Sequence, residues 1–354
     1  MHNIGIGVDA GKSITTGQNN VALGQDSLQS ITTASNNTAL GAFAGAGNSS
    51  TFGNNTYVGY AAGRYCGNST NNVFVGKQAG RQYTGESTII IGVEAGDQGS
   101  STGNRNTIIG TVACGGAALS GGDNLVLGYN AGHVLSSGNF NTFVGRDSGN
   151  LVTTGSKNTI IGGFDGNQGG LDIRTSSNNI VLSDGDGNPR GIFDGSGNFG
   201  VGVTPAVRLH VYGAAGNYNS IFRNGSDSGQ GVGFQRADGT QVGSITWAST
   251  TVSFNTSSDH RLKENVVDLT GATGRLKQLE PRRFNFIADA DTTVDGFLAH
   301  EVQSVVPEAI TGTHNEVDDD GNPVYQGIDQ SKLVPLLVAT IQELEARITA
   351  LESA

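Results

Sequence analysis

The sequence predicts a mainly β fibre of stacked repeats, then a β stalk, then a small α+β domain that ends in a helical coiled coil. Three observations predict this order: a Gly- and Asn-rich repeat of about 17 residues, two-residue alternation of apolar and polar residues in the middle, and a shift to acidic, helix-patterned sequence near the end. We therefore expect three parts, residues 1–170, 171–257 and 258–354.

The composition is that of a folded, β-rich repeat protein. Glycine accounts for 56 of 354 residues, charged residues for only 14% and apolar residues for 36%, whereas disordered chains are poor in apolar residues and strongly charged. The net charge of −11 lies mostly after residue 257, and the nearly neutral body lacks the basic surface that nucleic acid binding needs. No run of 18 apolar residues exists, so we expect no membrane insertion.

The cysteines and acidic runs do not predict a cofactor or metal. Cys66 and Cys114 lie at non-equivalent positions without a metal-binding spacing, so we expect two free thiols in a chain made in a reducing compartment. The acidic runs at residues 184–188 and 316–321 lack the spacing of a calcium loop.

Residues 1–170 carry ten copies of one unit, which reads Asn, a variable residue, two mostly apolar residues and Gly. Successive copies place this Gly 17, 17, 18, 17, 16, 18, 18, 17 and 17 residues apart. One copy has Thr88 in place of Asn, and a weaker eleventh copy, Asn179 to Ser183, follows a longer gap. Such regularity indicates a solenoid or roll, because one unit cannot bury its apolar face alone whereas stacked neighbours can.

Each unit is expected to form a strand of three or four residues and then a turn at Gly, which readily adopts positive φ. A second short strand can follow before an Asn/Ser/Gly loop closes the coil. Asn side chains at the same position of successive coils are expected to form hydrogen-bonded ladders along the axis.

Periodicity also predicts the elements after residue 170. Short strands with Gly, Asp and Asn turns are expected at residues 197–205, 208–211, 220–223, 231–234 and 243–247. After Asn265 we expect a short helix within residues 269–279, a strand at 283–286, a helix at 298–306 before Pro307, a strand at 324–328 and a long helix from Asp329.

The long helix contains Leu337, Ile341, Leu344, Ile348 and Leu351 at spacings of 4, 3, 4 and 3 residues. This is the a/d spacing of a coiled coil. Two to three heptads are short, and the seam can instead pack within one chain because periodicity does not choose the partner.

The candidate chemistry lies at residues 258–265, Ser-Asp-His-Arg-Leu-Lys-Glu-Asn, where the composition changes. A serine activated by a nearby base is a nucleophile, although an isolated Ser and Lys are more often a helix cap and a surface residue. A spacing of five places two side chains about 140° apart on a helix of 3.6 residues per turn. Ser258 is therefore expected in an extended segment, or opposite a lysine of a neighbouring chain.

Residues 258–354 resemble the C-terminal intramolecular chaperone, or endosialidase-type auto-processing, domain. The resemblance is carried by residues 258–265, by Gly-Phe-Leu-Ala-His-Glu-Val at 296–302, by Pro-Glu-Ala at 307–309 and by Leu-Val-Pro-Leu-Leu at 333–337. The repeats resemble the heads of trimeric bacterial adhesins and the shafts of phage tail fibres, and residues 197–247 resemble the distal fibre stalk, where three chains intertwine. These resemblances imply a trimeric fibre whose folding is coupled to assembly.

The chaperone resemblance implies a helper that templates trimer folding and then cuts itself off between Ser257 and Ser258. It implies Ser258 as nucleophile and Lys263 as general base. Lysine is ordinarily charged at pH 7, and burial in the trimer would favour the neutral amine that can take the serine proton. Asp259 and Arg261 are expected to form structural ion pairs. His300 is expected to be a packed helix residue or to assist the cleavage reaction.

These features predict a phage tail fibre or tail spike, a virion protein made in the host cytoplasm, with single-turnover serine autoproteolysis. Its expected partners are further copies of itself, a host bacterial surface polysaccharide or protein receptor, and phage tail components. One alternative is a spike that degrades polysaccharide, which needs paired carboxylates, but the repeat-borne acids are scattered in sequence: Asp9, Glu94, Asp147 and Asp165. A cell-surface trimeric adhesin is another. Because the chain begins within a repeat, we expect a distal fibre part or a fragment of a longer protein.

Overall fold

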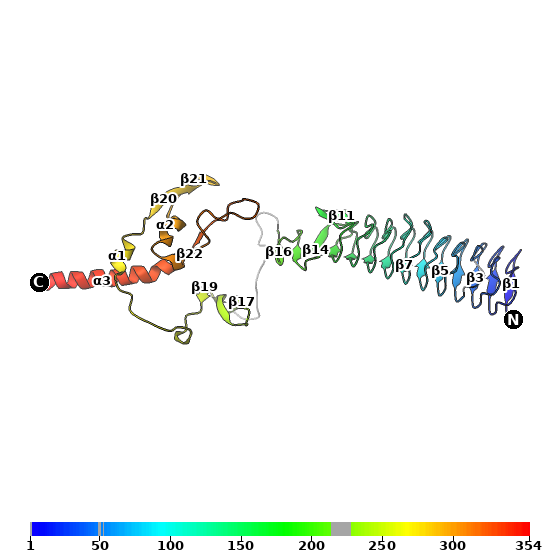
Figure 1. Cartoon of the computed structure of the whole chain (residues 1–354), viewed down its shortest axis with the longest axis horizontal. Coiled ribbons are helices and arrows are strands. Elements are labelled where there is room, and N and C mark those ends of the chain that lie inside the picture. Colours follow the sequence, from blue (N-terminus) through cyan, green and yellow to red (C-terminus); the bar gives the residue numbers. More distant parts are fainter. Residues whose placement is uncertain (1, 49–50, 52, 214–227) are drawn as a thin grey trace. The chain divides into compact units, whose positions relative to one another are not determined.

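The structure is a computed structural model that describes residues 2–48, 51, 53–213 and 228–354. It contains two compact units, Met1–Arg223 and Asn224–Ala354. The first is a stack of coils with one arrow in each coil, and the second contains short strands and helices (Figure 1). The strand predicted at residues 220–223 lies outside the described residues.

The first unit is a β-solenoid with one strand of three residues in each regular coil. Neighbouring strands pair in parallel at a constant register, which satisfies their backbone groups from the coils before and after. The predicted strand length is confirmed, and turns take the place of a second strand in the described coils. The ten strands are β1 (Ile4–Ile6), β2 (Val21–Leu23), β3 (Thr38–Leu40), β4 (Thr56–Val58), β5 (Val73–Val75), β6 (Ile89–Ile91), β7 (Thr107–Ile109), β8 (Leu125–Leu127), β9 (Thr142–Val144) and β10 (Thr159–Ile161).

The sheet continues beyond residue 170. β13 (Ile180–Ser183) pairs in parallel with β10, which confirms that the weaker eleventh copy belongs to the stack. β14 (Pro189–Phe193) and β15 (Phe199–Val201) then pair antiparallel, and β16 (Leu209–Val211) pairs in parallel with β15. The 14-stranded sheet therefore includes part of the segment expected to form a separate stalk.

One insertion interrupts the stack between β10 and β13. There, β11 (Asn167–Gln168) and β12 (Leu171–Asp172) form a two-stranded antiparallel hairpin apart from the main sheet. The insertion occupies the longer gap noted in the sequence, since Asn158 and Asn179 are 21 residues apart.

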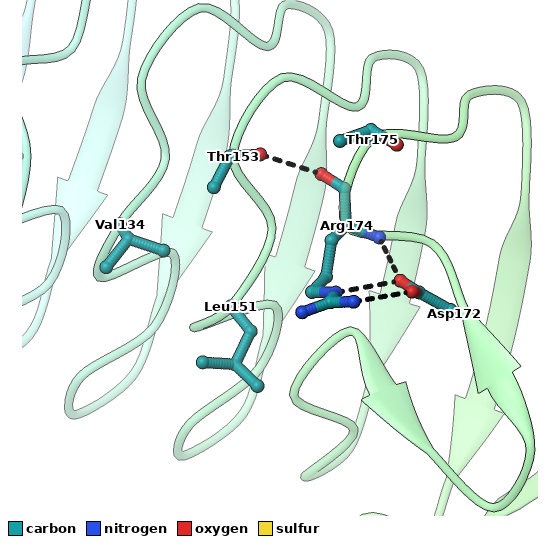
Figure 2. Close-up of a pocket in the computed structure, with 6 residues that line it drawn as sticks. All are labelled: Val134, Leu151, Thr153, Asp172, Arg174 and Thr175. Carbon is teal, nitrogen blue, oxygen red and sulfur yellow. Dashed lines mark hydrogen bonds and ion pairs between the residues drawn. The ribbon is translucent and has the colours of Figure 1, made fainter.

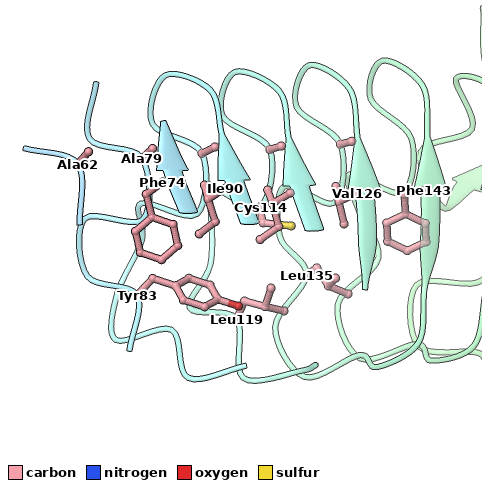
Figure 3. Packing of buried hydrophobic residues seen from close by; sticks show 14 of the residues in the cluster. Ala62, Phe74, Ala79, Tyr83, Ile90, Cys114, Leu119, Val126, Leu135 and Phe143 are labelled. Atoms are coloured by element: carbon pink, nitrogen blue, oxygen red, sulfur yellow. The ribbon is translucent and has the colours of Figure 1, made fainter. Parts of the chain in front are cut away.

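From β2 to β10 the middle residue of each strand points into the solenoid, where a second row of side chains lies opposite. Figure 3 shows Phe74, Ile90 and Phe143 along the strands, with Tyr83 and Leu135 across the interior. All five are fully buried. Burial of side chains of this size contributes roughly 1.5–3 kcal/mol each, so stacking the coils builds one continuous core.

The Asn that opens each repeat forms the predicted ladder. From Asn3 to Asn179, the side-chain oxygen at this position accepts a hydrogen bond from the backbone N–H of the same position in the next coil. The amide group also reaches a loop carbonyl, as Asn124 Nδ2 donates to Gly138 O at 3.0 Å. Beyond Asn3 these side chains are buried, so the ladder satisfies polar groups that water cannot reach.

The Gly after each strand is required by its conformation and by the space available. Across the ten repeats its φ lies between +112° and +147°. A Cβ on Gly110 would lie 2.1 Å from the carbonyl oxygen of Gly128 in the next coil. A larger residue would therefore strain the turn and separate the coils.

The outward positions of the strands form an exposed apolar face. The third residue of every strand from β1 to β10 is aliphatic. Ile6 is 60% exposed, and Leu40, Leu127 and Ile161 are at least 40% exposed. Large continuous apolar surfaces are uncommon on monomeric proteins and usually mark an interaction surface.

Both cysteines are free, as predicted, and both are fully buried in the solenoid. Burial raises the pKa of the Cys66 thiol well above its usual range, and that of Cys114 to about 12. Both thiols therefore remain protonated at neutral pH and are unreactive.

The second unit begins with a three-stranded antiparallel sheet of β17 (Ser228–Gln235), β18 (Gln241–Ala248) and β19 (Thr251–Thr256). The first two strands include those predicted at 231–234 and 243–247. All six residues of β19 are exposed. The division after Arg223 groups this sheet with the C-terminal part of the chain rather than with the solenoid.

Short helices, the long helix α3 and two two-stranded sheets complete the second unit around a compact core. The core contains Ala272, Val302, Val306, Leu333 and Leu336. The predicted helix before Pro307 is shortened to one turn, and the strand predicted at 324–328 to two residues. The elements are η1 (His260–Leu262), α1 (Ala272–Leu276), β20 (Arg282–Phe286), β21 (Asp289–Gly296), α2 (Ala299–Gln303), η2 (Pro307–Ala309), β22 (Ile310–Thr311), β23 (Gly327–Ile328), η3 (Gln330–Leu333) and α3 (Val334–Glu352).

The two faces of α3 differ. Leu336 and Thr340 are buried, and the Glu343 carboxylate accepts hydrogen bonds from the backbone N–H groups of Ala272 and Thr273 at 2.8 and 2.9 Å. The residues of the predicted seam are instead 41–77% exposed: Leu337, Ile341, Leu344, Ile348 and Leu351. In the described part of the chain, no helix has the length and apolar character needed to cross a bilayer.

Candidate functional site

The peptide bond predicted to be cut lies at the end of the three-stranded sheet. The Ser257 N–H donates to the Val242 carbonyl at 3.0 Å and its hydroxyl donates to the Gln241 carbonyl at 3.1 Å. Ser258 follows outside any strand or helix. The bond therefore joins a residue fixed to β18 and a residue that opens the C-terminal segment.

A single 3₁₀ turn brings Lys263 back to Ser258. After η1, Lys263 has an extended backbone, with φ −125° and ψ 143°. Its Nζ lies 2.7 Å from Ser258 Oγ of the same chain. Both residues are exposed. The two side chains thus meet without a shared helix, as the spacing of five requires.

Asp259 and Arg261 stabilise this turn, as expected from the sequence. Asp259 caps η1 by accepting from the Arg261 N–H at 2.8 Å, and the guanidinium donates to both of its carboxylate oxygens at 3.0 and 2.7 Å. Hydrogen bonding to Arg261 holds the pKa of Asp259 below its usual range. Asp259 is therefore a charged structural anchor rather than a proton carrier.

His300 lies on α2 and stacks against another histidine. The rings of His300 and His314 are 4.4 Å apart between centroids and nearly parallel at 9°. Both residues are exposed. The ring of His300 therefore has a packing partner of its own.

The arrangement of Ser258 and Lys263 can activate a hydroxyl group. At 2.7 Å, Nζ is within the range needed for proton transfer to or from Oγ. A neutral amine would accept the hydroxyl proton and make Oγ a nucleophile. The carbonyl carbon of Ser257 is bonded to the backbone nitrogen of Ser258, the residue that carries this oxygen.

Many apolar side chains near the pair are exposed. On β19, Phe254 is 80% exposed, and on the segment after the turn Val266 and Val267 are 81% and 85% exposed. Leu262, next to Lys263, is 64% exposed. This segment therefore presents an apolar surface that the described chain leaves uncovered.

Two surface cavities lie together on the solenoid. One of about 370 Å³ is lined by Val134, Leu151, Thr153, Asp172 and Arg174, and Figure 2 shows the last two joined by paired hydrogen bonds. The second, of about 380 Å³, has a different lining: Arg146, Asp147, Asn150, Asp165, Gln168 and Asp186. Sequence reasoning did not find these cavities, although the longer gap before Asn179 marked the insertion beside them.

The structure separates the four repeat-borne acids into two groups. Asp9 pairs with Lys12 and Glu94 with Lys77 on the surface. Asp147 and Asp165, in contrast, line one cavity together with Asp186. Carboxylates that are scattered in the sequence are therefore grouped in space, because stacking superposes successive coils.

Comparison with known families finds a match at the C-terminal side of the predicted cut. Residues 258–311 match the model of a peptidase family described as chaperone of endosialidase. The match includes Ser258 and Lys263, and it ends before residues 333–337, to which the sequence resemblance also extended. No curated protein matches the chain. The matched family is the autoproteolytic chaperone domain, and together with the N-terminal β-solenoid it fits a tail-spike-like protein with an intramolecular chaperone.

Proposed function

We propose that this protein is a phage tail fibre or spike that assembles as a homotrimer and then releases its C-terminal chaperone. The observation that carries the proposal is the 2.7 Å contact of Lys263 Nζ with Ser258 Oγ, at the first residue of the segment that matches the chaperone family. The body that remains after release is residues 1–257, the solenoid together with the three-stranded sheet. It binds a polysaccharide or protein receptor on the host bacterium and joins other tail components in the virion.

The cut proceeds in two steps. Neutral Lys263 takes the proton of the Ser258 hydroxyl, and Oγ attacks the carbonyl carbon of Ser257. The bond from that carbon to the Ser258 nitrogen breaks, the nitrogen takes a proton, and an ester joins Ser257 to Oγ. Water then hydrolyses the ester, which restores the Ser258 hydroxyl and leaves Ser257 with a free carboxylate.

Exposed apolar surface supports assembly from several copies of this chain. The seam of α3 has a/d spacing and remains exposed. The third residue of the solenoid strand is aliphatic in every regular coil and points outward. The segment that carries Ser258 and Lys263 adds Phe254, Val266 and Val267. Association would cover these surfaces and remove water from around Lys263, which favours the neutral form of an amine.

Electrophoresis under denaturing conditions tests the proposal. The wild type should release a fragment of about 10 kDa, because residues 258–354 are 97 of the 354 residues of a 36.3 kDa chain. Ser258→Ala and Lys263→Ala should stay whole yet trimeric by sedimentation. Lys277→Ala, an exposed lysine in the same segment, is the matched control and should cleave normally. If the wild type trimerises without cleaving, the proposed peptidase activity is wrong and only the proposed chaperone role is left.

A second candidate function is hydrolysis of the host polysaccharide. The observation that favours it is the grouping of Asp147, Asp165 and Asp186 around one cavity, because glycosidases use two carboxyl groups beside the scissile bond. Purified protein incubated with capsule or lipopolysaccharide of the host should then generate reducing ends. Asp165→Asn should abolish them, whereas a fibre that only binds generates none.

A further inference from the structure

The β11–β12 hairpin is a departure from the regular coil, and the two cavities lie on either side of it. Asp172 of β12 lines the first cavity and Gln168 of β11 lines the second. The hairpin is held in place, since Gln168 Nε2 donates to the Asp186 carbonyl at 3.0 Å and the Asn167 N–H donates to Asp165 Oδ1 at 2.7 Å. A fixed insertion in a uniform stack thus creates a local concave surface.

The two cavities adjoin each other. Asn150 lines one and the next residue, Leu151, lines the other. The Leu151 N–H donates to the Asp165 carbonyl at 2.8 Å, which connects the linings directly. Hydrogen bonding and charge from Asp172, with a smaller contribution from the charge of Asp165, raise the pKa of Arg174. The charged groups of both cavities therefore act on each other.

The linings offer three kinds of contact. Val134 and Leu151 provide an aliphatic surface in the first cavity. Asp186 makes no side-chain hydrogen bond to the described residues, so its carboxylate is free to accept from a ligand. Arg174 uses Nε and Nη2 on Asp172, which leaves Nη1 as a donor. A fixed, mostly polar cavity with a small apolar surface suits a ligand rich in hydroxyl groups.

The charge of the lining further narrows the ligand class. The second cavity places three carboxylates against one guanidinium, and the first contains a balanced pair. An acidic sugar would be repelled by the excess carboxylates. Across the described residues no group of three His, Cys, Asp or Glu side chains converges in a way that could hold a metal ion, so a bridging cation does not account for the carboxylates.

We propose that the β11–β12 hairpin and its two flanking cavities form a binding site for an uncharged saccharide. The inference rests on the proposed receptor-binding role of the solenoid and names the receptor class. Asp165 and Asp186 accept hydrogen bonds from sugar hydroxyls, Arg174 donates through Nη1 to ring and hydroxyl oxygens, and Leu151 packs against the apolar face of a sugar ring. The combined cavities provide room for more than one residue of a glycan chain.

The test uses full-length protein and four uncharged tetrasaccharides, which are maltotetraose, mannotetraose, β-1,4-galactotetraose and N-acetylchitotetraose, with tetragalacturonate as the acidic counterpart. Saturation-transfer NMR and calorimetry should detect binding of at least one uncharged probe and weaker binding of the acid. Asp186→Ala and Leu151→Ser should each weaken the bound probe about tenfold or more, because each removes a principal contact. Val8→Ser, at an exposed apolar position of the first coil, is the control and should bind as the wild type does.

The outcomes separate the two proposals when trimer size and cleavage are measured on the same preparation. The saccharide site alone is overturned if the protein forms a trimer and cleaves itself but fails any of three binding tests. These failures are binding of none of the four uncharged probes, tighter binding of the acidic probe, and unchanged probe affinity in the Asp186→Ala and Leu151→Ser variants. A protein that binds a probe through these residues but neither assembles nor cleaves overturns the proposed assembly and leaves the site in place.

Discussion

Tyr83 replaces a missing rung of the asparagine ladder, and this substitution leads to a quantitative prediction. Where other coils have Asn, the sixth has Thr88, which has no amide group to donate to a loop carbonyl. Tyr83 Oη donates to the Gly103 carbonyl at 2.7 Å instead, and Asn106 Nδ2 donates to Tyr83 Oη at 2.7 Å. Burial raises the pKa of the Tyr83 phenol, so the hydroxyl remains a donor at all ordinary pH values.

We expect Tyr83→Phe to destabilise the solenoid by about 2–4 kcal/mol, because it removes two hydrogen bonds and leaves the buried Gly103 carbonyl without its donor. For a unit of this size, that lowers the melting temperature by roughly 5–15 °C. The assay is thermal unfolding followed by circular dichroism. Tyr129→Phe is the control, since Tyr129 is 52% exposed and water can replace its contacts.

A double variant makes the reasoning refutable. Tyr83→Leu combined with Thr88→Asn restores the regular pattern, since Leu135 occupies the position of Tyr83 in a coil that has its asparagine. We expect it to melt well above Tyr83→Leu alone. A Tyr83→Phe variant that melts within about 2 °C of the wild type, or a double variant no more stable than the single one, would show that the hydroxyl does not replace the amide.

Three further changes test the turn, the C-terminal domain and the assembly. Gly110→Ala should cost about 2–4 kcal/mol by thermal unfolding, because its Cβ meets the Gly128 carbonyl, whereas Gly185→Ala, which meets nothing within 4 Å, should cost little. Hydrogen bonds from Thr273 and Ala272 lower the pKa of Glu343. The carboxylate therefore stabilises the C-terminal domain fully above about pH 5, and this stabilisation is lost as the pH falls through the lowered pKa. Glu343→Gln should reduce the acid dependence of helix content, measured by circular dichroism, whereas the control Glu345→Gln should not. Leu344→Asp should sediment as a monomer and stay uncut at pH 7.5, because it places a charge in the exposed seam, whereas a trimer of this variant would exclude the seam from assembly.

The sequence predicted the features that depend on periodicity. The spacing of the Gly and Asn positions indicated strands of three or four residues, positive φ at Gly and a hydrogen-bonded ladder, because every coil repeats the same local environment. It did not predict the role of Tyr83, since the compensation for Thr88 comes from the previous coil and depends on how the side chain crosses the core. The cavities beside β11–β12 were also hidden, because an irregular insertion has no neighbouring copy from which its shape can be inferred.

The candidate site was predicted in part, for a related reason. A spacing of five excluded a shared helix for Ser258 and Lys263, and the structure agrees, because the 3₁₀ turn after Asp259 folds the lysine back within the same chain. The sequence could not decide between this arrangement and a lysine from a neighbouring chain, because the bend depends on the hydrogen bonds between Asp259 and Arg261. The division of the chain after Arg223 was hidden as well, since the strands before and after it have similar alternation.

Because Nζ and Oγ already lie 2.7 Å apart in one exposed chain, alignment alone cannot delay the proposed cut until assembly. What can still delay the cut is the proton on the amine, since lysine in water becomes neutral only near pH 10.4. The assembly-defective Leu344→Asp variant should therefore stay whole at pH 7.5 and begin to cleave as the pH is raised toward 10.5, with the same fragment on a denaturing gel. Adding Lys263→Ala should abolish this alkaline cleavage, which separates it from base hydrolysis. If the variant remains folded by circular dichroism at pH 10.5 and still does not cleave, deprotonation is not sufficient, and a group from a neighbouring chain must complete the site.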